Sequence, residues 1–528
     1  MIVGSLAESY YFGIRMYSNI FAVLLGYVYA FFLVLPLTTN LDESIKTPYQ
    51  YFERRYGSRK YVRIITAFAG MIFYFSFLTL YLWGCTIMIS TIIPQLPLYA
   101  STIILGIYSV LGSIIGGYTQ STRINVFQFS LVLCGLILAC LFTIKKAQDF
   151  IDFGAFFDLA AANNRTDFFD ERVDLTTRYT VLNQLISLTI PWTCIHSLLL
   201  PNFMRYRSIK GTGLKRSLAV ISNFPFMVLI NSVLLVAGSM IVFLYFLGCD
   251  PLSSGKIVNK NQTGSFWIFL IFDEYAPTFT GIFFSSIVCY SVVQHSNGIA
   301  LCANTIYCEI LNPVLQVTKI RLREHTIKIF KMILTIFLGL FSILYAIGFQ
   351  FVKNTSLSLF FIFNNSTNSP ILGLFFLSAF NPYANHVGAM TAFVINLCIN
   401  YWWAMGHLNL YSNTGSQSSL QTTALCDRDT FQNLTAATYD LSQMDNPYNI
   451  SEAEPPFYPE NQVVYFFYTM APIWYCMFSL LFNLIFGSLF SFIYSLIKSK
   501  SFDVDSDFKE ERKQYLYIYK VREKYFNK

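Results

Sequence analysis

The chain has 528 residues, of which 55% are hydrophobic and only 12% are charged. Because a soluble domain typically carries about 25% charged residues, this composition excludes an ordinary water-soluble protein and indicates one that lies in a membrane. The formal net charge is +7, but the basic residues are clustered, so their positions carry more information than their sum.

Apolar segments of about 20 residues are typical of helices that span a membrane. The segment 2–14 is apolar but too short to cross one. We therefore expect an all-α polytopic membrane protein, with a transmembrane domain over residues 1–497 and a cytoplasmic basic tail over residues 498–528. The expected spans lie at about 17–39, 61–91, 98–118, 124–145, 181–204, 216–247, 275–311, 329–351, 357–380, 386–406 and 463–497.

The loops between the expected spans predict the orientation of the chain. The connections 42–63, 205–216 and 319–331 are rich in Lys and Arg, as is the tail, so the positive-inside rule places them in the cytoplasm. The alternate loops carry Asn-x-Ser/Thr glycosylation acceptors, which belong outside. Both signals predict a multi-pass protein with a cytoplasmic C-terminus and with its first residues on the extracellular side. The acceptors are Asn164, Asn261, Asn354, Asn433 and Asn449.

Most of the 11 cysteines lie in apolar segments, where cysteine behaves as a small hydrophobic residue. Their spacing matches no pattern of a metal site. Cys249 and Cys426 both lie in expected extracellular loops, where a disulfide between them is chemically allowed.

One apolar segment contains a run of polar residues, SVVQHSNGI at 291–299. Polar groups at membrane depth are costly and mark ion or substrate paths. Three other apolar segments are interrupted by Gly, Pro or Asn, at 112–118, 363–373 and 380–389. Such interruptions favour a transporter built with broken helices, although close helix packing through small residues is the alternative reading. The motifs HExxH, GxSxG and GxxxxGK[ST] are absent, so we expect neither an enzyme nor an ATP-driven pump.

Several of these segments resemble signatures of the sodium:solute symporter family. They are TPYQYFERRYGSRKYVR (47–63), GIFFSSIVCYSVVQHSNGIALCANTIYCEIL (281–311) and LGLFFLSAFNPYANHVGAMTAF (372–393). A further segment, GCDPLSSGKI (248–257), is similar to the branch of the family that carries monocarboxylates, iodide and biotin-type vitamins. The resemblance runs through almost the whole chain, and it is specific for the family but only weakly specific for the solute.

The resemblance implies a leucine-transporter-type inverted-repeat helical bundle that couples Na⁺ entry to solute uptake by alternating access. The family's key sodium site uses two adjacent hydroxyls, and Ser296 and Asn297 occupy those positions here. An interhelical hydrogen bond is the alternative role for this pair. For the substrate path the resemblance gives region-level expectations, Tyr10 and Tyr11 near the broken first repeat helix and Trp83 on the third helix.

The chain also departs from the family pattern. Asn297 replaces a serine, and His295 stands at a usually small apolar position, where it would add a titratable group near the substrate path. The stretch GSLAESYYFG (4–13) resembles the part of the first repeat helix just beyond its unwound centre. We therefore expect the chain to begin in mid-helix, as an N-terminally truncated member.

Our first hypothesis is a plasma-membrane symporter that couples Na⁺ to a small organic anion, a monocarboxylate or a vitamin-like solute. Its expected partners are Na⁺, the anion and the lipid bilayer, without nucleic acid and without any cofactor besides the coupling ion. A sugar or choline carrier of the same superfamily would differ only in the solute. The alternative from a different class is a transport-inactive paralogue that acts as a ligand sensor or interaction partner.

Overall fold

A computed structural model describes residues 2–39, 41–115, 118–148, 168–173, 175–177, 179–211, 213–247, 262–352, 356–413, 461–497 and 515–516. This part of the chain is built from helices and contains no strand. Several predicted features lie outside the described residues. These are the five glycosylation acceptors Asn164, Asn261, Asn354, Asn433 and Asn449, the cysteines Cys249 and Cys426, and nearly all of the tail.

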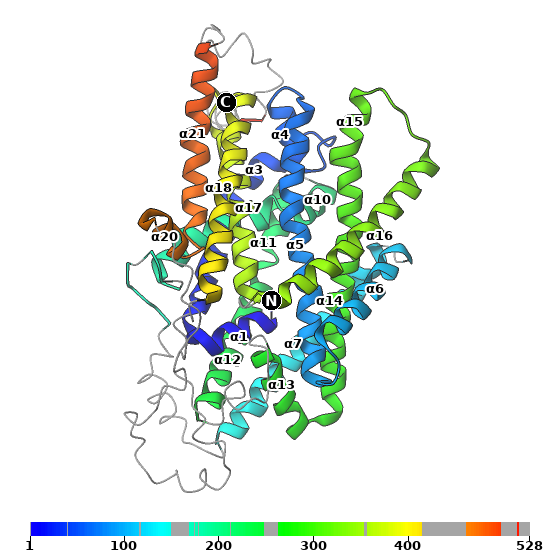
Figure 1. Cartoon of the computed structure of the whole chain (residues 1–528), viewed down its shortest axis with the longest axis vertical. Coiled ribbons are helices and arrows are strands. Elements are labelled where there is room, and N and C mark those ends of the chain that lie inside the picture. The colour runs from blue at the N-terminus through cyan, green and yellow to red at the C-terminus, as the bar shows by residue number, and fades with distance from the viewer. Residues whose placement is uncertain are drawn as a thin grey trace.

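The chain begins with a short helix, α1 (Ile2–Phe12), which packs against α12 (Phe224–Leu247) and α13 (Gln262–Tyr275). Figure 1 shows α1 lying across the long axis of the molecule. Gly13 follows with a φ of 68°, a left-handed conformation that a residue without a Cβ adopts without strain. The chain then turns through η1 (Gly13–Ser18) into α2 (Asn19–Tyr29), η2 (Ala30–Val34) and α3 (Leu35–Thr38).

Long helices pack beside this first region: α5 (Lys60–Ile92), α6 (Leu98–Ile115), α7 (Tyr118–Gln148), α14 (Pro277–Thr305) and α16 (Glu324–Gly348). Glycines bring them close, because a Cβ at Gly298 of α14 would overlap Leu78 of α5, and one at Gly339 of α16 would overlap Val110 of α6. Small residues at helix contacts are the usual means by which membrane helices approach one another.

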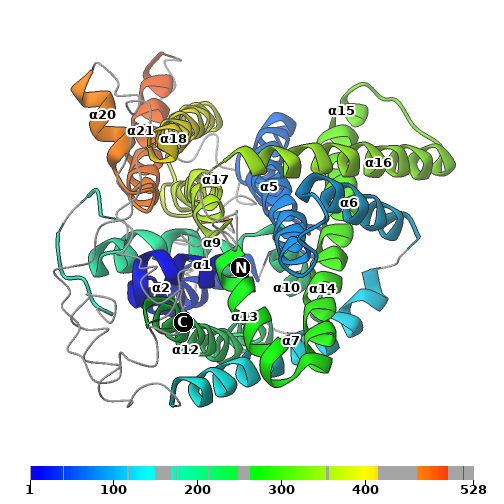
Figure 2. The ribbon, with the colours of Figure 1, turned by 60° about the horizontal axis from the view of Figure 1, so that its bottom comes forward.

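A second layer consists of α17 (Ser356–Phe380), α18 (His386–Asn413) and α21 (Tyr475–Ile497). Figure 2 shows α18 and α21 side by side, with α17 between this pair and α5. On α21 a stripe of small or polar residues recurs every fourth position and so lies on one face of the helix. The stripe is Ser479, Asn483, Gly487, Ser491 and Ser495.

The remaining helices are shorter. They are α4 (Pro48–Arg55), η3 (Asn183–Leu188), α9 (Thr189–Ser197), α10 (Leu200–Ser208), α11 (Gly213–Ile221), η4 (Ile306–Leu311), α15 (Asn312–Val317), η5 (Phe349–Phe351) and α20 (Gln462–Thr469). In Figure 1, α4 and α15 lie at one end of the molecule and α13 at the other.

Within the described residues, nine helical segments are long and apolar enough to cross a membrane. Each falls on a predicted span, and the first runs from Ile2 to Thr38, so the expected separate segment at 2–14 is part of it. The other two predicted spans differ for physical reasons. The segment 181–204 is divided among short helices, and six polar residues in 364–369 lower the hydropathy of α17.

The three expected interruptions do not break a span at its centre. The first coincides with the end of α6, the third with the connection between α17 and α18, and residues 363–373 stay helical through Pro370. Interior breaks lie instead at Gly13, within the first span, and between α9 and α10.

Candidate functional site

The polar run of α14 faces α6. The Nδ1 atom of His295 lies 2.7 Å from the hydroxyl of Ser109. The hydroxyl of Ser113 donates to the backbone carbonyl of Ser296 at 2.8 Å and to its hydroxyl at 3.2 Å. His295 and Ser296 are buried, whereas Asn297 is half-buried, and no described residue hydrogen-bonds its side chain. Ser296 thus makes an interhelical hydrogen bond, and Asn297 has amide atoms available for a ligand.

The aromatic residues predicted for the substrate path lie elsewhere. Tyr10 and Tyr11 of α1 are buried, with ring centroids 4.9 Å apart in an edge-on arrangement. Trp83 of α5 is fully buried with its ring centroid 5.9 Å from that of Phe349. Tyr10, Tyr11 and Trp83 thus belong to one buried hydrophobic cluster, whereas His295 and Ser296 lie at the contact between α14 and α6.

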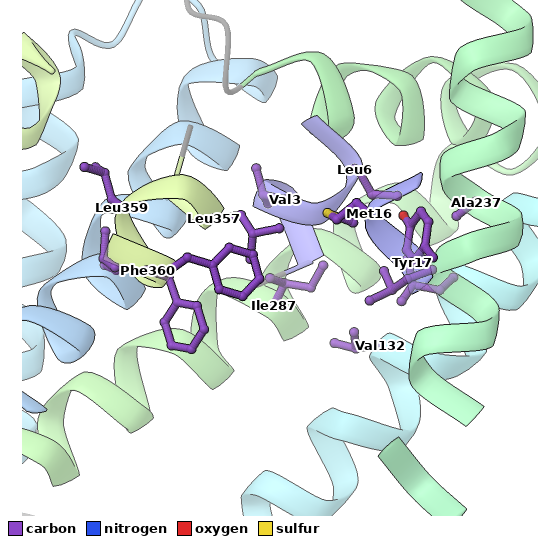
Figure 3. Close-up of a cluster of buried hydrophobic side chains, with 14 of the residues drawn as sticks. Val3, Leu6, Met16, Tyr17, Val132, Ala237, Ile287, Leu357, Leu359 and Phe360 are labelled. Carbon is purple, nitrogen blue, oxygen red and sulfur yellow. The ribbon is translucent and has the colours of Figure 1, made fainter. Parts of the chain in front are cut away.

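The environment of α1 is largely apolar. Figure 3 shows Val3, Leu6, Met16 and Tyr17 surrounded by side chains from four other helices, α7, α12, α14 and α17. This core holds the first segment of the chain in the middle of the bundle. The contributors labelled in Figure 3 are Val132, Ala237, Ile287, Leu357, Leu359 and Phe360.

A few polar groups lie within and beside this core. The phenol of Tyr179 donates to a carboxylate oxygen of Glu8 at 2.8 Å, and Glu8 is fully buried on α1. Arg15 pairs with Asp170 at 3.3 Å. A hydrogen bond from the side chain of Arg172 lowers the pKa of Asp170, so this carboxylate stays charged beside Arg15 at neutral pH. These contacts hold the residues that follow α1 against the segment before η3.

The clearest local break in a helix separates α9 from α10. Leu199 has an extended ψ of 129°, and the backbone amides of Leu198 and Leu199 both donate to the carbonyl of Cys194 at 2.7 and 2.9 Å. The side chain of Asn202 donates to the carbonyl of Ile195 at 2.7 Å. A helix end leaves amides and carbonyls without intrahelical partners, so the break exposes backbone groups that can bind a ligand.

His196 lies in the last turn of α9, immediately before this break. Its ring stacks on Tyr27 of α2, with centroids 3.7 Å apart, and lies 5.6 Å from the ring of Trp192. The Nε1 atom of Trp192 donates to Asn19 at 3.0 Å, which fixes that indole. His196 is only 5% exposed, and its Nε2 atom has no hydrogen-bond partner among the described residues.

A buried nitrogen without a partner is energetically unfavourable, so Nε2 of His196 is available to a ligand at the break. The sequence motifs point to the polar run of α14 and not to His196. The available signal was the proline in HSLLLPN at 196–202, since a proline has no N–H for the carbonyl four residues earlier and its ring clashes with that carbonyl.

At the end of the molecule that carries α4, charged residues join α4, α5 and η4. Arg63 pairs with Glu309 at 2.7 Å and with Glu53 at 3.1 Å, and Lys60 pairs with Glu53 at 2.8 Å. Glu53 and Glu309 are buried, so these pairs hold α5 and the end of α14 together. Within the described residues no group of three or more His, Cys, Asp or Glu side chains could hold a metal ion.

A model of the sodium:solute symporter family matches residues 1–396. The chain is 22% identical over 415 residues to the sodium/iodide cotransporter of Homo sapiens, covering 77% of this chain and 61% of that one. It is 20% identical over 443 residues to sodium-coupled monocarboxylate transporter 2 of Danio rerio, covering 83% of this chain and 67% of that one. The chain therefore spans about two thirds or less of the length of these curated relatives.

A solved structure of a Na⁺-coupled sialic acid symporter, in a substrate-bound outward-open state, has the same fold. The TM-score is 0.62 at 14% sequence identity, and the superposition covers 93% of this chain and 89% of that chain. The all-helical inverted-repeat architecture expected from the sequence is thereby confirmed.

Proposed function

Because the chain belongs to the sodium:solute symporter family, we propose that it couples the entry of Na⁺ to the uptake of a small organic anion across the plasma membrane. The observation that carries this proposal is the break between α9 and α10, beside the buried and unpaired Nε2 of His196. At the start of α10 Pro201 has no N–H, so the amides of Leu200 and Asn202 and the imidazole of His196 would be the donors for an anionic group.

The start of α10 favours a negatively charged solute for electrostatic reasons. The amides at a helix N-terminus carry a partial positive charge, and in a membrane interior a solute charge needs such compensation. The names of the relatives agree with this choice, since iodide and monocarboxylates are anions. A monocarboxylate or a vitamin-like carboxylate is therefore the solute class that we propose.

For sodium we propose Ser296 and Asn297 of α14. A hydroxyl and an amide carbonyl are oxygen ligands, which a hard cation prefers. The hydroxyl of Ser296 accepts from Ser113, so it keeps a lone pair that can face Na⁺. Moving one charge through about 100 mV is worth roughly 2.3 kcal/mol, so two Na⁺ ions per cycle would drive strong accumulation of a monovalent anion.

Uptake into proteoliposomes tests the proposal and separates it from its alternative. With the purified full chain we expect uptake of radiolabelled short-chain monocarboxylates, biotin or iodide when an inward Na⁺ gradient is imposed, and none with an equal K⁺ gradient. Solute binding without uptake would favour a transport-inactive sensor. Uptake that is equal in Na⁺ and K⁺ would contradict sodium coupling.

A further inference from the structure

A second polar region lies far along the chain from the proposed sodium ligands, in the middle of α17. Six consecutive residues, Asn364 to Ser369, are polar and at most 2% exposed. Helix α17 packs against α5, α9, α18 and α21, so this run is enclosed by other helices and not by lipid. Burying a polar group without a hydrogen bond costs about 1–3 kcal/mol. Six buried polar residues in a row therefore require a physical explanation.

Part of the run is satisfied by neighbouring side chains and backbone. Asn368 donates to Asn364 at 2.7 Å, and Thr367 lies 2.6 Å from the hydroxyl of Tyr401 of α18. Asn365 donates to the carbonyl of Pro472 at 3.0 Å. After these contacts, more oxygen atoms than N–H groups of the run remain without a hydrogen-bond partner among the described residues.

Oxygen atoms without partners gather where α17, α18 and α21 meet. Asn483 of α21 donates through Nδ2 to the carbonyl of Pro370 at 2.7 Å, and Asn400 of α18 donates through Nδ2 to Asn396 at 2.7 Å. Each of these two amides leaves a buried Oδ1 atom that no described residue hydrogen-bonds. The hydroxyl of Ser369 lies beside the thiol of Cys476, a weakly bonding neighbour, and has no other partner there.

The orientation of both amides is fixed by these contacts. Nδ2 of Asn483 and of Asn400 each faces a carbonyl oxygen, so the reverse orientation would place two oxygens against each other. The free atoms are therefore acceptors. A further acceptor is the backbone carbonyl of Ser366. In a regular helix it would accept from the N–H of residue 370, but Pro370 has none.

A continuous series of contacts across α17, α18 and α21 connects these four groups. Ser369 precedes Pro370, whose carbonyl Asn483 contacts. The Nδ2 atom of Asn400 lies 3.3 Å from the hydroxyl of Ser479, which is four residues from Asn483 on the same face of α21. Side chains four residues apart on a helix are about 5–6 Å apart.

The chemistry of the cluster selects its ligand. Its free atoms are neutral oxygens, and α17 and α21 contain no charged residue. An anion would meet three groups that only accept hydrogen bonds, the two amide oxygens and the Ser366 carbonyl, and a divalent ion would lack the carboxylates that such ions take in proteins. A monovalent cation fits, since hydroxyl, amide and carbonyl oxygens can replace its hydration shell.

We propose that Ser369, Asn400, Asn483 and the backbone carbonyl of Ser366 form a binding site for a monovalent cation between α17, α18 and α21. This site is separate from Ser296 and Asn297. A cation there would hold α17 against the α18–α21 pair. Helix α17 also contacts α5 and α9, and α9 belongs to the proposed solute site. The proposal does not depend on transport, because a structural cation site can exist in a chain that carries no solute.

The test measures the melting temperature of the purified full chain while NaCl replaces N-methyl-D-glucamine chloride at constant ionic strength. Ser296→Ala is the background, because it removes one of the two ligands proposed for the first sodium site. We expect Na⁺ to raise the melting temperature of the Ser296→Ala variant. Adding either Ser369→Ala or Asn483→Leu to that variant should abolish the rise. The matched control is Ser491→Ala, which removes an equally buried hydroxyl of α21 outside the site and should keep the rise.

Two results with these variants would overturn the proposal. One is a melting temperature of Ser296→Ala that does not respond to Na⁺, and the other is a response that survives Asn483→Leu unchanged, as expected if these oxygens bind only water. Because Asn483→Leu removes a helix contact and can fail to fold, Ser369→Ala, whose hydroxyl hydrogen-bonds no described residue, provides an independent test. It removes one proposed ligand without removing a hydrogen bond between helices, and an unchanged rise would refute the site. Loss of uptake would not affect this result, so the two proposals fail separately.

Discussion

At the scale of single residues, His196 tests the proposed solute site. Replacing it by alanine removes the stacked ring and the free Nε2 atom. A hydrogen bond to a charged group is worth about 1.5–3 kcal/mol, so we expect His196→Ala to raise the KM for the anion by about tenfold or more. His196→Gln, which retains a donor, should recover part of this loss.

The control for that measurement is His325→Ala, at the exposed start of α16, which should leave the KM for the solute unchanged. If His196→Ala lowers kcat and leaves KM at its original value, the imidazole does not bind the solute in the ground state. The proposed donor role would then be wrong.

A second prediction at this scale separates the two roles of Ser296. Ser296→Ala removes both a proposed Na⁺ ligand and a contact with Ser113, whereas Ser113→Ala removes only the contact. We expect the Na⁺ concentration for half-maximal uptake to rise in Ser296→Ala and to change little in Ser113→Ala. An equal shift in both variants would mean that Ser296 serves helix packing alone.

At the scale of elements, the packing of the helices depends on close contacts between them. Gly388 of α18 faces the backbone of Ser491 on α21, and an added Cβ would overlap its nitrogen. Overpacking of this kind costs about 1–3 kcal/mol, so Gly388→Ala should lower the melting temperature of the purified chain. Gly281→Ala on α14 is the matched control, since a Cβ there meets nothing within 4 Å. Equal melting temperatures for the two variants would contradict the observed α18–α21 contact.

The elements also show what the sequence can predict. The long apolar helices α5 and α16 coincide with predicted spans to within five residues at each end, because a membrane requires about 20 consecutive apolar residues whatever their neighbours are. The break at Leu199 was not predicted. It depends on one proline and on hydrogen bonds to Cys194 and Ile195, which no hydropathy pattern contains.

The candidate site was predicted less well than the fold. Motif resemblance found α14, but it could not show that Ser296 faces α6, because the side of a helix that meets each neighbour is set by tertiary packing. It also missed His196, whose importance comes from stacking on Tyr27, a residue 169 positions earlier in the chain. Ser296 and Asn297 remain predictions.

At the scale of the whole molecule, arginines link helices at one end. Arg63 ties α5 to the end of α14 through Glu309. Arg207 of α10 donates to the carbonyls of Thr38, Thr39, Leu41, Asp42 and Ile45, which ties α10 to the segment after α3. Leu200 of α10, beside the proposed solute site, packs in one buried cluster with Ala67 of α5 and Leu301 of α14, the helix that carries the proposed sodium ligands.

The central claim is that this chain binds Na⁺ in preference to other monovalent cations, and one measurement tests it directly. It is the melting temperature of the purified wild-type chain in NaCl against KCl at matched ionic strength. A ligand at a hundredfold excess over its Kd stabilises the folded state by about 2.7 kcal/mol, so we predict a clearly higher melting temperature in Na⁺. Equal melting temperatures in the two salts would contradict the account.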